Sequence, residues 1–257
     1  MLLALLSPAK RLDFSPPPAF AKPTQPGLLQ DTAKLAARGK KLSRTELRRL
    51  MDISPKLADL NYERFQSFDV KNKAETKPAI FAFAGDVYVG LDAKTLGAAD
   101  IAFAQQHVAV LSGLYGLLRP LDSIQPYRLE MGTRLKNERG ADLYDFWRKS
   151  IAAYINDLTS TMTDPTIVNL ASDEYWSAVD ENALRAPVIQ AVFKEIKGAK
   201  AQTVSFLAKK ARGMMARYIV QRRLTSADEL KQFDTAGYAY DAKSSTTSLM
   251  VFSRKAK

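Results

Sequence analysis

The 257-residue sequence contains no cysteine and a single histidine, His107. Without thiols the chain can form neither disulfides nor zinc–thiolate or cysteine-ligated iron–sulfur sites. One imidazole leaves mainly carboxylates, tyrosines and amides as metal ligands, so we predict no dedicated transition-metal site and no cofactor. His107 precedes an apolar run and has no evident partner in the sequence, and we interpret it as structural.

Long hydrophobic runs and common catalytic motifs are also missing. No apolar run approaches the roughly 20 residues of a membrane span, and the opening MLLALLSPAK lacks the features of a secretory signal. We therefore expect a monomeric cytoplasmic protein with no membrane partner. The chain has no phosphate-binding Walker loop, no GxGxxG after a strand, no GxSxG and no metal-binding histidine pair. Any enzymatic chemistry would depend on lysine, arginine, tyrosine, serine and carboxylate side chains.

Positive charge is concentrated at the two ends of the sequence. The net charge is +11; residues 1–80 hold 15 basic and 8 acidic side chains, and residues 197–257 hold 13 and 4. Such a distribution suits a polyanion such as nucleic acid. It is equally consistent with a charge that serves solubility alone.

Five short apolar runs predict buried strands: residues 2–6, 79–83, 108–111, 166–170 and 203–207. Unbroken apolar runs are typical of strands covered on both faces by helices, which indicates an α/β (mixed α+β) fold. We expect a single compact domain, 1–257, with a mixed β-sheet wrapped by helices. Each run ends in a small or polar cluster, and in open α/β sheets such ends form ligand sites, so the clusters are expected to converge on one cleft. The proline-rich residues 13–27 are expected to form an extended surface arm.

The stretch 112–135, SGLYGLLRPLDSIQPYRLEMGTRL, is the strongest candidate for a functional loop. It follows a predicted strand and combines glycines, prolines and arginines without a regular period. Arg119 and Arg128 offer planar forks for phosphate or carboxylate, and Tyr127 offers a ring and a hydroxyl. The alternative is a structural loop whose arginines pair with Asp122 and Glu130.

Residues 43–67 are expected to form two short helices joined by a tight turn. Ser43 and Glu46 make a capping box, and Ser54 followed by Pro55 begins a second helix. This arrangement resembles a helix-hairpin-helix DNA-binding element, in which amides at the start of the second helix hold a phosphate.

In that resemblance Ile53 takes the position of the apolar plug and Lys56 that of the phosphate-facing lysine, with Arg48 nearby. The sequence departs from the motif at Asp52 and Ser54, where glycines are usual. A plain packed helical hairpin is the alternative interpretation.

Residues 209–224, KKARGMMARYIVQRRL, predict a helix with one apolar and one basic side. The basic side holds Lys209, Lys210, Arg212 and Arg217, with Gly213 in its middle. Glycine destabilises a helix by about 1 kcal/mol relative to alanine. A glycine in the middle of this helix therefore indicates that a phosphate or another element approaches the backbone closely there. We predict that Gly213 leaves room for a ligand phosphate. The alternative is a solvated basic face.

The segment 169–176, NLASDEYW, offers Asp173 or Glu174 as a general base, and Asp86 is a third candidate. Both neighbouring carboxylates also suit the first turn of a helix capped by Ser172, where they stabilise the helix dipole.

Taken together, the motifs resemble the YaaA family of bacterial peroxide-stress proteins. The matching blocks are LLSPAK, GDVYVGL, FAQQHVAVLSGLYGLLRPLDSIQPYRLEMG, NLASDEYW and SFLAKKARGMMARYI, in order along nearly the whole chain. The resemblance implies a positively charged cleft, DNA binding, and a role in limiting free iron and oxidative DNA damage. Cleft candidates are Ser7, Lys10, Arg119, Tyr127 and Arg128, together with Glu174, Lys209 and Arg212.

The sequence therefore favours a protein that binds duplex or branched DNA through the backbone, without strong sequence readout. One alternative is an enzyme acting on a nucleotide or a nucleic-acid base in the same cleft, using Asp86, Asp173 or Glu174, with a nucleotide or phosphate as ligand. Another is an iron-handling protein with an all-oxygen site.

Overall fold

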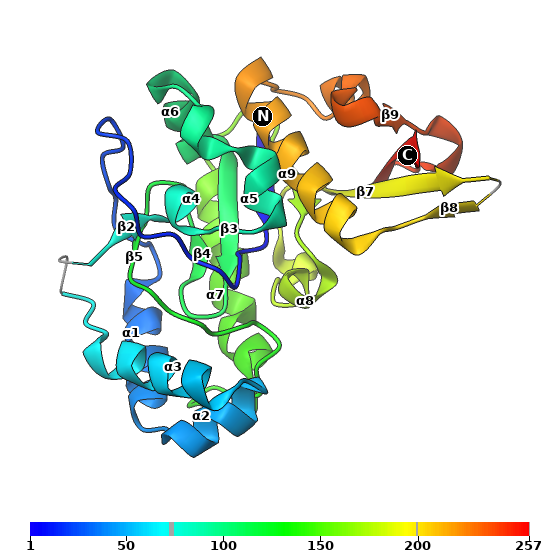
Figure 1. Cartoon of the computed structure of the whole chain (residues 1–257). Helices are drawn as coiled ribbons and strands as arrows, with labels where there is room; N and C mark the ends of the chain where they lie inside the picture. Colours follow the sequence, from blue (N-terminus) through cyan, green and yellow to red (C-terminus); the bar gives the residue numbers. More distant parts are fainter. Residues whose placement is uncertain (72–74, 199, 257) are drawn as a thin grey trace.

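The computed structural model describes residues 1–71, 75–198 and 200–256, and has an α/β fold built on one mixed sheet (Figure 1). Within these residues the main sheet has the strand order β4-β3-β1-β6-β7-β10-β9, and β8 pairs with β7. β3, β1, β6, β7 and β10 run parallel to one another, and β4, β8 and β9 are antiparallel to their neighbours. The strands are β1 (Leu2–Leu6), β3 (Val108–Ser112), β4 (Gly116–Leu118), β6 (Thr166–Leu170), β7 (Val188–Lys197), β8 (Lys200–Gln202), β9 (Ala239–Tyr240) and β10 (Leu249–Lys255). The single-domain α/β fold with a mixed sheet is as predicted.

The centre of the sheet is formed by β1, whose five residues are all buried. It pairs on one side with β3 and on the other with β6, with Leu6 opposite Val110 and Leu170. The chain thus passes from β1 outward to β3 and then returns to the opposite side of β1 to form β6. The gap between the carboxyl ends of β1 and β6 is a topological switch point, the place where open α/β sheets bind ligands.

Helices cover the sheet and extend beyond its carboxyl edge (Figure 1). α9 packs against β7 with α5 and α6 beside it, and α7 packs against β4. The α2–α3 hairpin lies beyond the carboxyl ends of β1 and β3. The helices are α1 (Leu29–Lys40), α2 (Arg44–Met51), α3 (Pro55–Ser67), α4 (Ala79–Ala82), α5 (Asp86–Leu91), α6 (Ala98–His107), α7 (Leu143–Thr159), α8 (Asp173–Trp176) and α9 (Ser205–Arg222).

Two of the five predicted strands are wrong. Residues 79–83 contain the short buried helix α4 (Ala79–Ala82), which starts after Pro78. Residues 203–207 enter α9 at Ser205, and the strand at this point, β8, ends at Gln202. Both errors have one cause, because a short apolar run has too few residues to distinguish a buried helix from a buried strand. The predictions at 2–6, 108–111 and 166–170 are confirmed as β1, β3 and β6.

The central stretch 112–135 is more ordered than its sequence indicates. It contains β4 and the short strand β5 (Ser123–Ile124), which pairs with β2 (Lys77–Pro78). Leu114, Tyr115 and Leu117 are fully buried, so the first third of the stretch belongs to the core. The irregular residues 13–27 pack against the segment that follows β4, where Thr24 pairs with Asp122 in an isolated bridge.

α5 and α9 cross at two glycines. A Cβ atom added to Gly213 would lie 1.8 Å from the carbonyl oxygen of Val87, and one added to Gly90 would lie 2.0 Å from that of Lys210. The close approach predicted at Gly213 is therefore made by another element. The prediction that Gly213 leaves room for a phosphate is wrong, because the backbone of α5 fills that space.

His107 is structural, as predicted. Its ring is buried and stacks on Phe103 with a centroid separation of 3.9 Å, and its Nδ1 lies 2.8 Å from the carbonyl oxygen of Leu2. Burial lowers the pKa of the imidazole below its usual value. Among the helices that the structure describes, none is both long and apolar enough to span a membrane.

Candidate functional site

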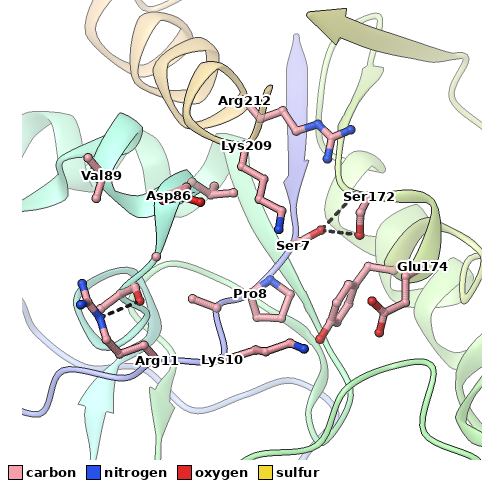
Figure 2. A pocket seen from close by; sticks show the side chains of 15 residues that line it. Ser7, Pro8, Lys10, Arg11, Asp86, Val89, Ser172, Glu174, Lys209 and Arg212 are labelled. Atoms are coloured by element: carbon pink, nitrogen blue, oxygen red, sulfur yellow. Dashed lines mark hydrogen bonds between the residues drawn. The ribbon is translucent and has the colours of Figure 1, made fainter. Parts of the chain in front are cut away.

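A cleft of about 420 Å³ opens at the switch point of the sheet (Figure 2). It joins four segments that are far apart in the sequence: the residues after β1, the start of α5, the start of α8 and the first half of α9. Four of the five polar clusters predicted to converge, at 7–10, 84–86, 171–174 and 209–210, contribute to this lining, although Ala171, Asp173 and Lys210 are not part of it. The fifth cluster, at 112–113, does not line the cleft. The lining side chains include Ser7, Lys10, Arg11, Asp86, Ser172, Glu174, Tyr175, Lys209 and Arg212.

The floor of the cleft is a hydrogen-bonded junction between the two central strands. The backbone N–H of Ser172 donates to Ser7 Oγ over 2.9 Å, and the two serine Oγ atoms are 3.3 Å apart. The hydroxyl of the buried Tyr88 donates to the carbonyl oxygen of Ser7 over 3.2 Å. These bonds hold the end of β1 to the start of α8 and fix the position of the serine hydroxyls.

Two cations of α9 form the upper wall. Figure 2 shows the ammonium of Lys209 reaching down toward Ser7, with the guanidinium of Arg212 beside Ser172. The Nε of Arg212 is buried and has no hydrogen-bond partner within the part of the chain that the structure describes. Burial lowers the pKa of Arg212, and the nearby Asp173 carboxylate partly opposes that shift. A buried donor without a partner costs roughly 1–3 kcal/mol.

The opposite wall carries cations that are already paired. Lys10 Nζ lies 2.6 Å from Glu130, and Arg128 Nη2 lies 2.9 Å from the other oxygen of the same carboxylate. Arg128 belongs to a small adjoining cavity and has a buried Nε without a partner in the described structure. Glu130 therefore offsets part of the charge of Lys10 and Arg128.

The candidate acid and base residues are separated by the fold. Glu174 lines the cleft and accepts a hydrogen bond of 3.1 Å from the backbone N–H of Gly132. Asp86 lines it from the first turn of α5. Asp173 lies in the first turn of α8 but does not line the cleft, and it acts on the site through its charge on Arg212.

Three other predicted site residues lie outside the cleft. Arg119 Nε donates to the carbonyl oxygen of Gln105 over 2.9 Å. Arg217 Nη1 donates to the carbonyl oxygens of Leu91 and Asp92 at the end of α5, over 3.0 and 2.8 Å. The side chain of Lys210 is exposed. Arg119 and Arg217 thus have structural partners.

Tyr127 is buried and lies in the adjoining cavity with Arg128. Its hydroxyl is 2.7 Å from Ser112 Oγ. Burial raises its pKa well above the usual value for tyrosine, so it remains a neutral hydroxyl.

The predicted helical hairpin is present as α2 and α3. Ser43 and Glu46 form the capping box, and Ser54 Oγ accepts from the backbone N–H of Leu57 over 3.4 Å. Ile53 is buried in the turn, whereas Arg48 and Lys56 are exposed. The geometry is that of a capped, packed hairpin; DNA binding by this element stays a prediction.

Sequence reasoning missed Arg11, Tyr175 and Val89 as lining residues, and treated Ser172 only as a helix cap. Arg11 and Ser172 could have been found from position alone, since each follows closely on a predicted central strand. Val89 gave no signal, because its role depends on the crossing of α5 and α9. No cluster of three or more histidine, aspartate or glutamate side chains placed to hold a metal ion occurs among residues 1–71, 75–198 and 200–256.

Comparison with known proteins identifies the family. The sequence matches the family described as peroxide stress protein YaaA over residues 2–244. The chain belongs to this family. Among its relatives, a UPF0246 protein of Phenylobacterium zucineum is 50% identical over 253 residues, which cover 98% of this chain and 95% of the relative. UPF0246 proteins of Caulobacter vibrioides and Saccharophagus degradans are 49% and 48% identical, each match covering 98% or more of both chains.

The family match confirms the resemblance drawn from the five sequence blocks. Four of those blocks meet at the cleft. LLSPAK contributes Ser7 and Lys10, GDVYVGL contributes Asp86, NLASDEYW contributes Glu174, and SFLAKKARGMMARYI contributes Lys209 and Arg212. Membership of the YaaA family connects the chain to peroxide stress.

Proposed function

We propose that the protein binds DNA during the peroxide response, holding the sugar–phosphate backbone in the basic cleft without strong sequence readout. The observation that carries this proposal is the pair of cations on α9, Lys209 and Arg212, which line one wall of an open cleft. Arginine forks suit phosphate oxygens, and Lys209 adds a second cation on the same wall.

The exposed hairpin residues extend this surface beyond the cleft. Asp52, which replaces a glycine of the helix-hairpin-helix pattern, has a left-handed backbone with φ of 49°. That conformation favours glycine, the residue usual at this position of the motif, and supports the proposed role of the turn. Lys56 in the first turn of α3 and Arg48 at the end of α2 would then contact phosphates at a second position.

Salt-dependent binding to duplex and branched DNA tests the proposal. Affinity should fall with a slope of about 0.9 in log K per log salt for each phosphate neutralised. Arg212→Ala should lower both affinity and slope for all sequences alike, whereas Arg148→Ala, an exposed arginine on α7, should change neither. Absence of binding at low salt, or an affinity that does not depend on salt, would contradict the proposal. A loss confined to one sequence would indicate base readout.

A double-mutant cycle tests whether the two walls hold one ligand. Arg128→Ala and Arg212→Ala should show a coupling of roughly 0.5–3 kcal/mol in binding free energy, as expected for residues that share a ligand. Purely additive effects would assign the two arginines to separate contacts.

The second candidate function is catalysis on a nucleotide or nucleic-acid base in the same cleft. Glu174 and Asp86 both line a cavity that also contains Lys209 and Arg212, and its volume of about 420 Å³ is within the range of small-molecule sites. Phosphate would bind the cations while a carboxylate served as acid or base. Release of base or phosphate by the protein, abolished in Glu174→Gln with binding retained, would favour this function over binding alone.

A further inference from the structure

Two large apolar side chains are exposed on α5 and α9, the two helices that contribute to the basic cleft. Phe206, in the first turn of α9, is 60% exposed, and Val89, on α5, is 55% exposed. These are the highest exposures of any large hydrophobic side chain in the part of the chain that the structure describes. Val89 lines the cleft directly.

The crossing of α5 and α9 brings together the segments that carry these two side chains. Residues three or four apart on a helix are neighbours on its surface, so Phe206 lies next to Lys209 and Lys210. Gly90 meets the backbone of Lys210 at the crossing, and Val89 precedes Gly90 in the chain. Phe206 and Val89 therefore lie on segments that lead to one contact point between the two helices.

The core does not require Phe206. The buried face of α9 is formed by Ala208, Ala211, Met215 and Ile219, and Phe206 lies on the opposite, basic side. An aromatic ring left in water beside lysines is the arrangement by which proteins bind unpaired nucleic acid, since the ring stacks on a base and the cations hold the backbone.

We propose that Phe206 is a stacking platform for an unpaired nucleobase, with Val89 against the edge of that base and Lys209 on the adjacent phosphate. The inference rests on the proposed DNA binding and names the form of nucleic acid that the cleft prefers. In a duplex the faces of the bases are covered by their neighbours, so the ring can contact a base only in a single strand, at a strand end or at a branch. The protein thus binds single-stranded or branched DNA more tightly than duplex.

Paired oligonucleotides isolate the contribution of the base. The probes are a single strand of thymidylates and a strand of the same length and charge in which the sugars carry no bases. Phe206→Ala should lower affinity for the first by about tenfold, within the 1–3 kcal/mol that stacking of one base contributes, and should leave the second unchanged. Phe20→Ala, which removes a 42% exposed ring from the 13–27 arm, is the matched control and should affect neither probe.

Two further variants separate stacking from general apolar contact. Phe206→Trp should retain affinity, and its added fluorescence should be quenched by the thymidylate strand but not by the baseless one. Phe206→Leu should lose most of the affinity difference between the probes, because it keeps apolar area without an aromatic face. Equal affinity of Phe206→Leu and the wild type for the thymidylate strand would overturn the stacking proposal.

The outcomes for the wild type distinguish this inference from the proposed function. Equal, salt-dependent affinity for both probes would overturn the stacking inference and leave backbone binding intact. Absence of binding to either probe and to duplex DNA at low salt would overturn the proposed function itself.

Discussion

Replacing Gly213 by serine should destabilise the fold by forcing α5 away from α9. The new Cβ would lie 1.8 Å from the carbonyl oxygen of Val87 and 2.7 Å from the amide nitrogen of Leu91, both backbone atoms that no side-chain rotation can move. Ordinary contact begins near 3.4 Å, so the helices must separate by about 1.6 Å at this point.

The size of the effect follows from two opposing contributions. Overpacking of this kind typically costs 1–3 kcal/mol, and a clash between backbones belongs at or above the upper end of that range. The gain in helix propensity from glycine to serine is about 0.5 kcal/mol. We expect a net loss of about 2.5 kcal/mol in the free energy of unfolding, which for a urea slope of about 3 kcal/mol/M lowers the midpoint by roughly 0.8 M.

Urea denaturation followed by circular dichroism measures this loss. Gly97→Ser is the matched control, because a Cβ there meets nothing within 4 Å and serine is favoured at the start of α6. An unchanged midpoint for Gly213→Ser would refute the close crossing. Unchanged stability combined with a loss of DNA affinity would mean that the glycine makes room for a ligand after all.

The buried ion pair and the lone histidine give two further predictions. Arg254→Met should lower the free energy of unfolding, measured by urea denaturation, by about 3–5 kcal/mol. The reason is that Glu195, which is 3% exposed, would lose its hydrogen bonds of 2.9 and 3.0 Å to the guanidinium. An unaltered midpoint would show that the hydrogen bond of 2.6 Å from Tyr238 is enough to stabilise the buried carboxylate. His107 should titrate in NMR below pH 6.5, the usual value, because burial lowers its pKa, and as the chain's single histidine it gives an unambiguous signal. Because the pKa of His107 is lower in the folded state, the unfolded state binds the proton more readily. The contribution of His107 to stability is therefore present above about pH 6.5 and is lost as the pH falls toward the folded-state pKa. His107→Gln should remove this part of the pH dependence of stability.

The sequence predicts the centre of the fold well because local chemistry determines it. The all-apolar residues 2–6 and the mostly apolar residues 166–170 suit strands buried on both faces. The helix starts at Ser43 with Glu46 and at Ser54 with Pro55 depend only on neighbouring residues. The errors occur where tertiary contacts determine the local structure. The run at 79–83 is too short to show a period, and Gly213 gave a correct signal of close approach without naming the partner.

The same distinction applies to the site. Ser7, Lys10, Asp86, Glu174, Lys209 and Arg212 could be predicted because each follows the end of an apolar run or lies on the basic side of a helix. Arg119 and Arg217 have the same chemistry, but carbonyl groups from distant elements use their donors. The alternative interpretation of the central loop proved partly right, since Arg128 pairs with Glu130.

The position of β1 in the sheet has a consequence for how the chain folds during synthesis. Leu2–Leu6 leaves the ribosome before its partners Val108–Ser112 and Thr166–Leu170, which follow about 100 and 160 residues later. At a synthesis rate of about 5–20 residues per second, an entirely apolar strand waits on the order of ten seconds or more for its second neighbour. Ser7 cannot meet Ser172 before then, so the cleft is among the last parts of the molecule to form. A nascent chain stalled before residue 166 would expose this strand, and a chaperone that binds short apolar segments should recognise it.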